Sequence, residues 1–87
     1  MSYHVIVTPA PSKFLGRLRD ESLKRRITRA LHAIENNPRP QGCIKLQGGD
    51  ELYRVRVGDY RIVYQVQDTV LVVLVVQIGH RRDIYRQ

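Results

Sequence analysis

Three arginines lie close together in the stretch LYRVRVGDYRIVYQV, residues 52–66. Arg54 and Arg56 precede a turn sequence, and Arg61 follows it. The guanidinium group is a rigid, planar fork whose donors match the oxygens of a phosphate. Because like charges that face each other across a hairpin destabilise it, folding alone gives no reason for this grouping. The three side chains are therefore candidates for binding an anionic ligand.

A tight turn would place these arginines on one face of a hairpin. The dipeptide Gly58-Asp59 predicts a two-residue hairpin loop, which pairs Arg56 with Arg61. Directly opposed residues share a face of the sheet. One face then carries side chains suited to a core, namely Tyr53, Val55, Val57, Tyr60, Ile62 and Tyr64. The other face carries the three arginines.

More candidate chemistry follows the last predicted strand, in the segment QIGHRRDIYRQ. It supplies His80, Arg81, Arg82 and Tyr85, and regular strand alternation places His80 on the same side as Arg61. Arginines can hold a scissile phosphate and stabilise its developing negative charge. Other groups must exchange the protons that cleavage requires, and Tyr85 could also stack on a base. This combination suits RNA cleavage without a metal ion.

The charge balance agrees with an anionic partner. Lys plus Arg number 15 against 8 acidic residues, giving a formal net charge of +7 and a pI near 10.2. Twelve of the 15 basic residues are arginines, a bias that favours a phosphate-bearing or acidic protein partner. A merely solvated basic surface is the alternative. Cys43 is the only cysteine, which excludes an intramolecular disulfide and a cysteine-rich metal site, and we expect no cofactor or metal.

The length and hydrophobicity of the chain limit its class. Its 87 residues predict a single domain spanning 1–87. The N-terminus lacks the apolar core of a signal peptide. The longest apolar run, residues 70–76, is far shorter than the ~20 residues of a membrane helix. We therefore expect a soluble, cytoplasmic protein that makes no membrane contact.

The elements that must position these residues follow from periodicity and capping signals. We predict a strand at 3–8, helices from 9 to about 19 and from 20 to about 36, a loop at 39–50, and strands at 52–57, 60–66 and 70–78. Thr8 and Asp20 are suitable N-caps, and Pro38 prevents the second helix from continuing. Gly48-Gly49 predicts a tight turn within the loop.

The fold class follows from the order of these elements. It reads β-α-α-β-β-β, without a βαβ repeat, which excludes a doubly wound parallel sheet. The dipeptides Gly58-Asp59 and Asp68-Thr69 favour antiparallel hairpins between the last three strands. The last strand is apolar on both faces, which predicts a central strand covered on both sides. We expect an α+β fold with a mostly antiparallel sheet and two N-terminal helices packed on one face.

The segments YRVRVGDYRIVY and GHRRDIY, in that order, resemble the RelE branch of the RelE/ParE toxin superfamily. The resemblance covers nearly the whole chain, including the NNP sequence that ends the second helix. It implies a RelE-like fold and a ribonuclease that cuts messenger RNA in the ribosomal A site, leaving 2′,3′-cyclic phosphate and 5′-hydroxyl ends. It also implies a cognate antitoxin as partner and an oligomeric toxin–antitoxin complex.

The resemblance assigns roles position by position. Arg61 resembles the family's phosphate-binding arginine, Arg81 its C-terminal arginine beside the leaving group, and Tyr85 its terminal tyrosine. Arg82 is the neighbour with which Arg81 could exchange roles. The segment between Gly79 and Tyr85 is shorter than in well-known members, which changes the expected placement of the tyrosine.

A departure from the family concerns the general base. Arg54 and Arg56 occupy positions at which well-known members have lysines. A lysine can be tuned to exchange a proton near neutral pH, whereas an arginine stays charged. Either the role of general base passes to Tyr85 or His80, or the rate of cleavage is reduced. The predicted catalytic residues are Arg61, Arg81, Tyr85, Arg56 and His80, and the predicted phosphate-binding residues are Arg54, Arg56, Arg61 and Arg82.

Two other functions remain open. A ParE-like toxin would share the fold but act on DNA gyrase, and it would not need the catalytic cluster. A non-catalytic module would only bind RNA or a protein partner. The arginines together with Tyr85 favour the ribonuclease over the ParE-like toxin.

Overall fold

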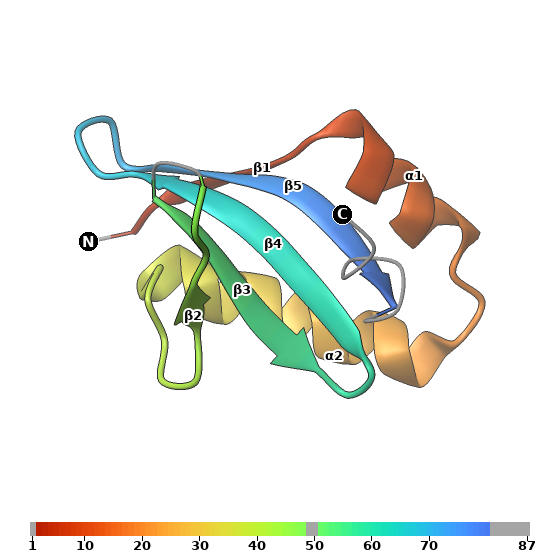
Figure 1. Cartoon of the computed structure of the whole chain (residues 1–87). Coiled ribbons are helices and arrows are strands. Elements are labelled where there is room, and N and C mark those ends of the chain that lie inside the picture. The colour runs from red at the N-terminus through yellow and green to blue at the C-terminus, as the bar shows by residue number, and fades with distance from the viewer. Residues whose placement is uncertain (1, 49–50, 81–87) are drawn as a thin grey trace.

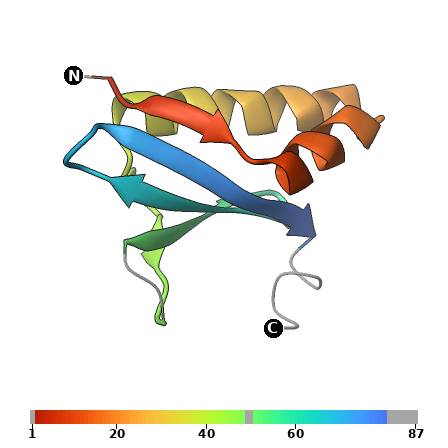
Figure 2. The same ribbon diagram turned by 90° about the horizontal axis from the view of Figure 1, so that it is seen from above.

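The computed structural model describes residues 2–48 and 51–80. In chain order its elements are β1 (His4–Val7), α1 (Pro9–Arg17), α2 (Glu21–Asn36), β2 (Ile44–Lys45), β3 (Leu52–Val57), β4 (Tyr60–Gln67) and β5 (Val72–His80), as labelled in Figure 1. The strands form one sheet in the order β1-β5-β4-β3-β2. Only the β1–β5 pairing is parallel among these. Figure 2 shows both helices on one face of the sheet, so the predicted α+β architecture is confirmed.

Both helices begin where the sequence predicts. The Asp20 carboxylate accepts a hydrogen bond from the Leu23 backbone N–H at 3.0 Å, which makes Asp20 the N-cap of α2. Thr8 occupies the N-cap position of α1, but its hydroxyl donates to the Val75 carbonyl oxygen at 2.7 Å instead of capping the helix. That bond ties the start of α1 to β5. The first helix ends at Arg17, slightly earlier than predicted.

The core lies between α2 and the helix-facing side of the sheet. Ile27 and Ile34 of α2 and Ile62 and Tyr64 of β4 are fully buried there. Burying such a side chain contributes roughly 1.5–3 kcal/mol relative to leaving it exposed. The Tyr64 hydroxyl donates to the Pro38 carbonyl oxygen at 2.8 Å, so its polar end is satisfied. The apolar face predicted for the hairpin is the face that the helices cover.

The segment predicted as a loop contains a short strand. In β2, Ile44 pairs with Arg54 and Lys45 with Tyr53, antiparallel. The prediction was wrong here because two residues carry too little periodicity to be recognised as a strand. Within the described part of the chain, β2 pairs with the first half of β3 alone. The half of β3 nearest the hairpin turn, residues 55–57, therefore forms an edge of the sheet.

The start and environment of β5 also differ from the prediction. The strand begins at Val72, after a four-residue connection in which Leu71 has a φ of 55°. Val70 lies in that connection and is 61% exposed. The central strand of the sheet is β4, and Val76 of β5 is 39% exposed. The predicted burial on both faces of β5 is therefore wrong, because the helices cover one face alone.

An irregularity in β5 changes the direction of its last side chains. Val63 pairs with Gln77, whereas the next residue, Tyr64, pairs with Val75. Val76 is thus an extra residue, a β-bulge that shifts the alternation of side chains by one position. Each residue after the bulge therefore lies on the face of the sheet opposite to the one that regular alternation predicts. This change affects the position of His80.

Candidate functional site

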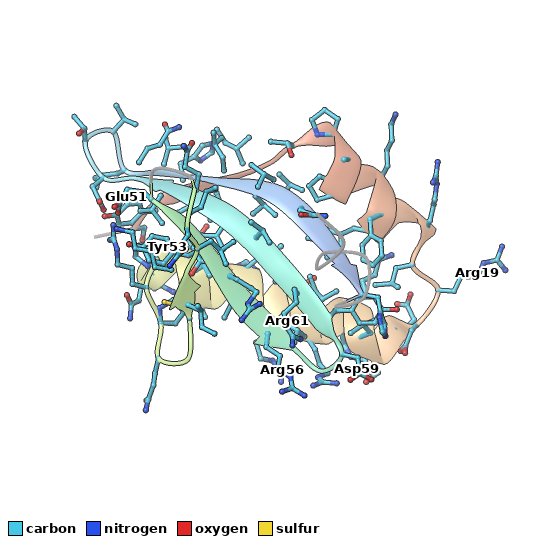
Figure 3. All side chains as sticks on the ribbon, in the orientation of Figure 1. Arg19, Glu51, Tyr53, Arg56, Asp59 and Arg61 are labelled. Carbon is cyan, nitrogen blue, oxygen red and sulfur yellow. The ribbon has the colours of Figure 1, made fainter. Side chains whose placement is uncertain are left out.

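The hairpin of β3 and β4 places three arginines on the sheet face opposite the helices. Arg56 pairs with Arg61, and Arg54 pairs with Val63, as the sequence predicts. Because opposed residues share a face, all three side chains start from this surface, which we call the arginine face. Figure 3 shows Arg56 and Arg61 at the hairpin end of the sheet, close to the turn that contains Asp59.

Arg61 is the most enclosed of the three arginines. It is 7% exposed, and its Nη1 donates to the Tyr60 carbonyl oxygen at 3.3 Å. Its partner on β5 is Gly79, which presents no side chain beside it. A charge held away from water interacts more strongly with an opposite charge than an exposed one does. A phosphate that reaches this guanidinium must displace part of its present surroundings.

Arg56 has a different environment. Its side chain is exposed, and its Nε donates to the Gly58 carbonyl oxygen at 2.9 Å. That bond directs the guanidinium toward the hairpin turn and the open edge of β3. Arg54 lies further along the strand, beside β2, and is half-buried. The arginine face therefore presents cations at the edge as well as at the centre of the sheet.

His80 does not join these arginines. It pairs with Tyr60, so it shares the helix-facing side of the sheet. The two rings pack edge to face with centroids 5.4 Å apart, and Tyr60 also contacts Phe14 of α1. The prediction that His80 leaves on the side of Arg61 is wrong, because the bulge at Val76 shifts the alternation. Regular periodicity could not indicate a bulge.

The other predicted site residues lie beyond the end of β5. Arg81, Arg82 and Tyr85 fall outside the described residues, so their roles stay predictions. Arg54, Arg56 and Arg61 do not themselves exchange a proton near neutral pH, because a guanidinium remains charged. Among residues 2–48 and 51–80, no cluster of three or more His, Cys, Asp or Glu side chains is arranged to hold a metal ion.

Two further arginines approach the hairpin from α2 and were not predicted as site residues. A Cβ added to Gly58 would lie 3.3 Å from Nη1 of Arg26, so that guanidinium covers the turn. Arg29 follows one helical turn later and borders the same depression as Arg56. Sequence periodicity shows that both side chains lie outside the apolar stripe of α2. It does not show that they point toward β3, because that depends on how the helix packs.

Arg39 lies at the end of the sheet opposite the hairpin turn and is bound by carboxylates. Arg39 donates to Glu51 at 2.6 Å, to Asp68 at 2.7 Å and to the Tyr53 hydroxyl at 2.9 Å. Hydrogen bonds from Arg39 and then Tyr3 lower the pKa of Asp68 to about 2. Those from Arg39, Lys45 and Tyr53 lower the pKa of Glu51. This arginine joins three segments of the chain and is satisfied by carboxylates, so we interpret its role as structural.

Comparison with known proteins identifies relatives of this chain. A family model described as ParE toxin of the type II toxin–antitoxin system parDE matches residues 5–85. The toxin RelE of Mycobacterium tuberculosis is 30% identical over 84 residues, which cover 97% of this chain and 87% of that protein. Neither helix in the described part of the chain has the length and hydrophobicity required to span a bilayer.

Two solved structures share the fold over almost the full length. The archaeal RelE–RelB complex from Pyrococcus horikoshii aligns with a TM-score of 0.82 and 31% identity, covering 93% of this chain and 97% of that one. The intact E. coli RelBE toxin–antitoxin complex aligns with a TM-score of 0.80 and 26% identity, covering 91% and 96%. The RelE-like fold expected from the sequence is therefore confirmed.

Proposed function

This chain belongs to the RelE/ParE toxin superfamily of type II toxin–antitoxin systems, and we propose that it is an endoribonuclease that cleaves messenger RNA on the ribosome. The observation that carries the proposal is the pairing of Arg56 with Arg61 on a basic face that folding does not require. Arg61 is almost excluded from water there. Two like charges placed opposite each other weaken a hairpin. An anionic phosphate between or beside them would reverse that effect.

The chemistry proposed is a transesterification within the RNA strand. The 2′-oxygen attacks the adjacent phosphorus and the 5′-oxygen leaves, which yields a 2′,3′-cyclic phosphate and a 5′-hydroxyl. Arg61 would hold the non-bridging oxygens and stabilise the charge that develops on them. Arg81 would act beside the leaving oxygen. No metal ion is required for these steps.

The two proton transfers need a base and an acid. Arg54 and Arg56 would bind phosphate, because their guanidinium groups do not release a proton near neutral pH. Tyr85 is our candidate for one transfer, since its hydroxyl can both donate and accept. His80 is not a candidate for the other transfer, because it packs against Tyr60 on the opposite face. Arg82 would add a phosphate contact.

The RelE relatives with solved complexes are bound to RelB partners, and we propose a cognate antitoxin for this chain. Carboxylates are the natural bidentate partners of arginine, so the antitoxin would supply acidic residues to Arg54, Arg56 or Arg61. The complex would be oligomeric, and the toxin would act in the cytoplasm, where messenger RNA is translated. A complex structure in which the partner contacts only the helices and leaves those arginines open would contradict this arrangement.

The test of the function is cleavage of messenger RNA on programmed ribosomes by the purified chain. We expect cuts at the A-site codon, cyclic phosphate at the new 3′ ends and little cleavage of the same RNA without ribosomes. Ribosome binding without cleavage would instead indicate a non-catalytic module.

The description of the matching family model as a ParE toxin supports one alternative, a toxin that inhibits DNA gyrase. Such a toxin does not need an arginine pair on the sheet face. Gyrase supercoiling should therefore be assayed in parallel with the same protein preparation. Inhibition of gyrase without messenger RNA cleavage would replace the ribonuclease by this alternative.

A further inference from the structure

An open depression lies between α2 and the hairpin end of β3. Its volume is about 330 Å³, and it is lined by Arg26, Arg29, Ala30, Ala33, Arg56, Val57 and Gly58. We call it the edge groove, because it borders the part of β3 that β2 does not cover. Its three cations come from two elements that are distant in the sequence.

The geometry of this region brings the side chains of Arg26, Arg29 and Arg56 to the edge groove. Arg26 and Arg29 are three positions apart on α2, so they lie on the same side of the helix. Arg26 extends over the turn, where its Nη1 and Nη2 lie 3.3 and 3.4 Å from the position of a Cβ on Gly58. Gly58 has a φ of +60°, and its carbonyl oxygen accepts the hydrogen bond from Arg56 that turns this side chain toward the groove.

The charges of the edge groove are not compensated by carboxylates of the described residues. Among residues 2–48 and 51–80, neither Arg26 nor Arg29 nor Arg56 forms an ion pair. Asp20 and Asp59 border a neighbouring depression that Arg26 and Arg56 also line, but neither forms an ion pair with them. Arg39, by contrast, contacts two carboxylates at 2.6 and 2.7 Å. The groove therefore holds an excess of positive charge that an anion would stabilise.

We propose that the edge groove binds a second phosphate of the RNA strand whose scissile phosphate lies at Arg61. This inference rests on the proposed ribonuclease function. Arg56 belongs to both places, since it starts from the arginine face and its guanidinium points to the groove. An RNA strand carries a phosphate at every nucleotide, so a strand held on the sheet face presents further phosphates at the sheet's edge. Arg26 and Arg29 then position the substrate and take no part in bond breaking.

The test compares two double variants that remove the same charge. In R26A/R29A the groove loses both helical arginines, whereas R17A/R19A removes two exposed arginines near the end of α1, where Arg19 projects away from the body in Figure 3. The probe is a short single-stranded RNA oligonucleotide, titrated at several salt concentrations. Each neutralised phosphate contributes about 0.7 to the slope of log affinity against log salt for single strands.

We expect R26A/R29A to bind the oligonucleotide about tenfold or more weakly at low salt, with a slope shallower by about 0.7. The control R17A/R19A should keep the slope of the unmodified chain. R26K/R29K retains the charges without the planar fork, so it should recover most of the slope and only part of the affinity. Equal affinity and equal slope for R26A/R29A and the unmodified chain would overturn the proposal.

Cleavage on ribosomes separates failure of this inference from failure of the proposed function. R26A/R29A should raise the ribosome concentration at half-maximal cleavage and leave the rate at saturation nearly unchanged. If the unmodified chain cleaves nothing, the ribonuclease function fails, but a shallower slope for R26A/R29A still supports phosphate binding in the groove. If R26A/R29A loses affinity for the antitoxin alone and not for RNA, the groove binds acidic protein side chains and the proposal is wrong. Thermal unfolding of each variant shows whether it is folded.

Discussion

Twelve arginines give this chain its charge, and the structure separates them by what surrounds each guanidinium. Arg39 is held by Glu51 and Asp68 and ties the chain together. Arg61 is almost enclosed on the face of the sheet that the helices leave uncovered. Arg26 forms no ion pair within the described residues and lies over a turn. The residue type alone predicts none of these differences, because all depend on neighbours that are remote in the sequence.

Arg61→Ala tests the contact to the scissile phosphate. If Arg61 stabilises the developing charge as an oxyanion contact does, the cleavage rate on saturating ribosomes should fall by roughly 10²–10³. The affinity for ribosomes should change much less. Arg19→Ala removes an equally charged but exposed side chain and should leave the rate unchanged. A full cleavage rate in Arg61→Ala, with the variant shown to be folded, would exclude this residue from catalysis.

Tyr85→Phe and Tyr85→Ala separate proton transfer from stacking. If the hydroxyl exchanges a proton, Phe should lower the cleavage rate while ribosome binding remains. If the ring stacks on a base, Phe should be nearly silent and Ala should weaken cleavage, because stacking on an aromatic ring contributes about 1–3 kcal/mol. The readout is single-turnover cleavage at saturating ribosomes. Unchanged cleavage in both variants would remove Tyr85 from the site.

At the level of elements, the β3–β4 hairpin and the bulge in β5 decide which side chains meet. The hairpin turn sets a register in which Arg56 faces Arg61. The bulge at Val76 sends His80 to the helix-facing side, against Tyr60. A strand that differed by this one residue would present the opposite set of side chains after the bulge. The composition of the arginine face is therefore controlled by one turn and one irregularity.

The start of α2 offers an element-scale test of stability. Asp20→Ala removes the carboxylate that accepts the Leu23 N–H, and the free energy of unfolding should fall by about 0.5–2 kcal/mol. Asp20→Asn keeps an acceptor and should lose much less. Chemical denaturation with urea measures both changes. If Ala and Asn destabilise the protein equally, the cap does not act through this hydrogen bond.

The whole molecule has two ends of different character, visible in Figure 3. The hairpin end carries Arg56 and Arg61, with Arg26 reaching over it from α2. The other end carries the network in which Arg39 joins Glu51 and Asp68. Among residues 2–48 and 51–80, Arg39 at the second end is paired with carboxylates, whereas Arg26 and Arg56 at the first end form no ion pair. Under the proposed function, this division places stability and binding in separate parts of one small sheet.

That division predicts how stability responds to acid. The pKa of Asp68 is lowered from 3.8 to about 2 in the folded state by the hydrogen bonds from Arg39 and Tyr3. Its stabilisation is therefore fully present above about pH 4 and is lost as the pH falls toward about 2. Asp68→Asn should flatten this part of the curve of melting temperature against pH. Asp59→Asn, at the opposite end of the sheet, is the matched control and should keep it; identical curves for all three proteins would contradict the role of the network.

Local patterns in the sequence determined much of this protein. The start of each helix, the strand Leu52–Val57, the register of the hairpin and the apolar face of that hairpin agree with the structure. Each depends on signals within a few residues, such as a capping side chain, a turn dipeptide or alternating hydrophobicity. The pairing of Arg56 with Arg61 belongs to this group, because a two-residue turn specifies it.

Only the tertiary structure decided the remainder. The strand β2 exists because it pairs with β3, and the bulge at Val76 arises where β5 meets β4. Likewise, the enclosure of Arg61 and the approach of Arg26 to Gly58 depend on how distant segments pack. Sequence periodicity reports which side of its own element a residue occupies, whereas pairing and packing between elements determine what that side faces. That is why the arginines of the hairpin could be predicted, and why the position of His80 and the edge groove could not.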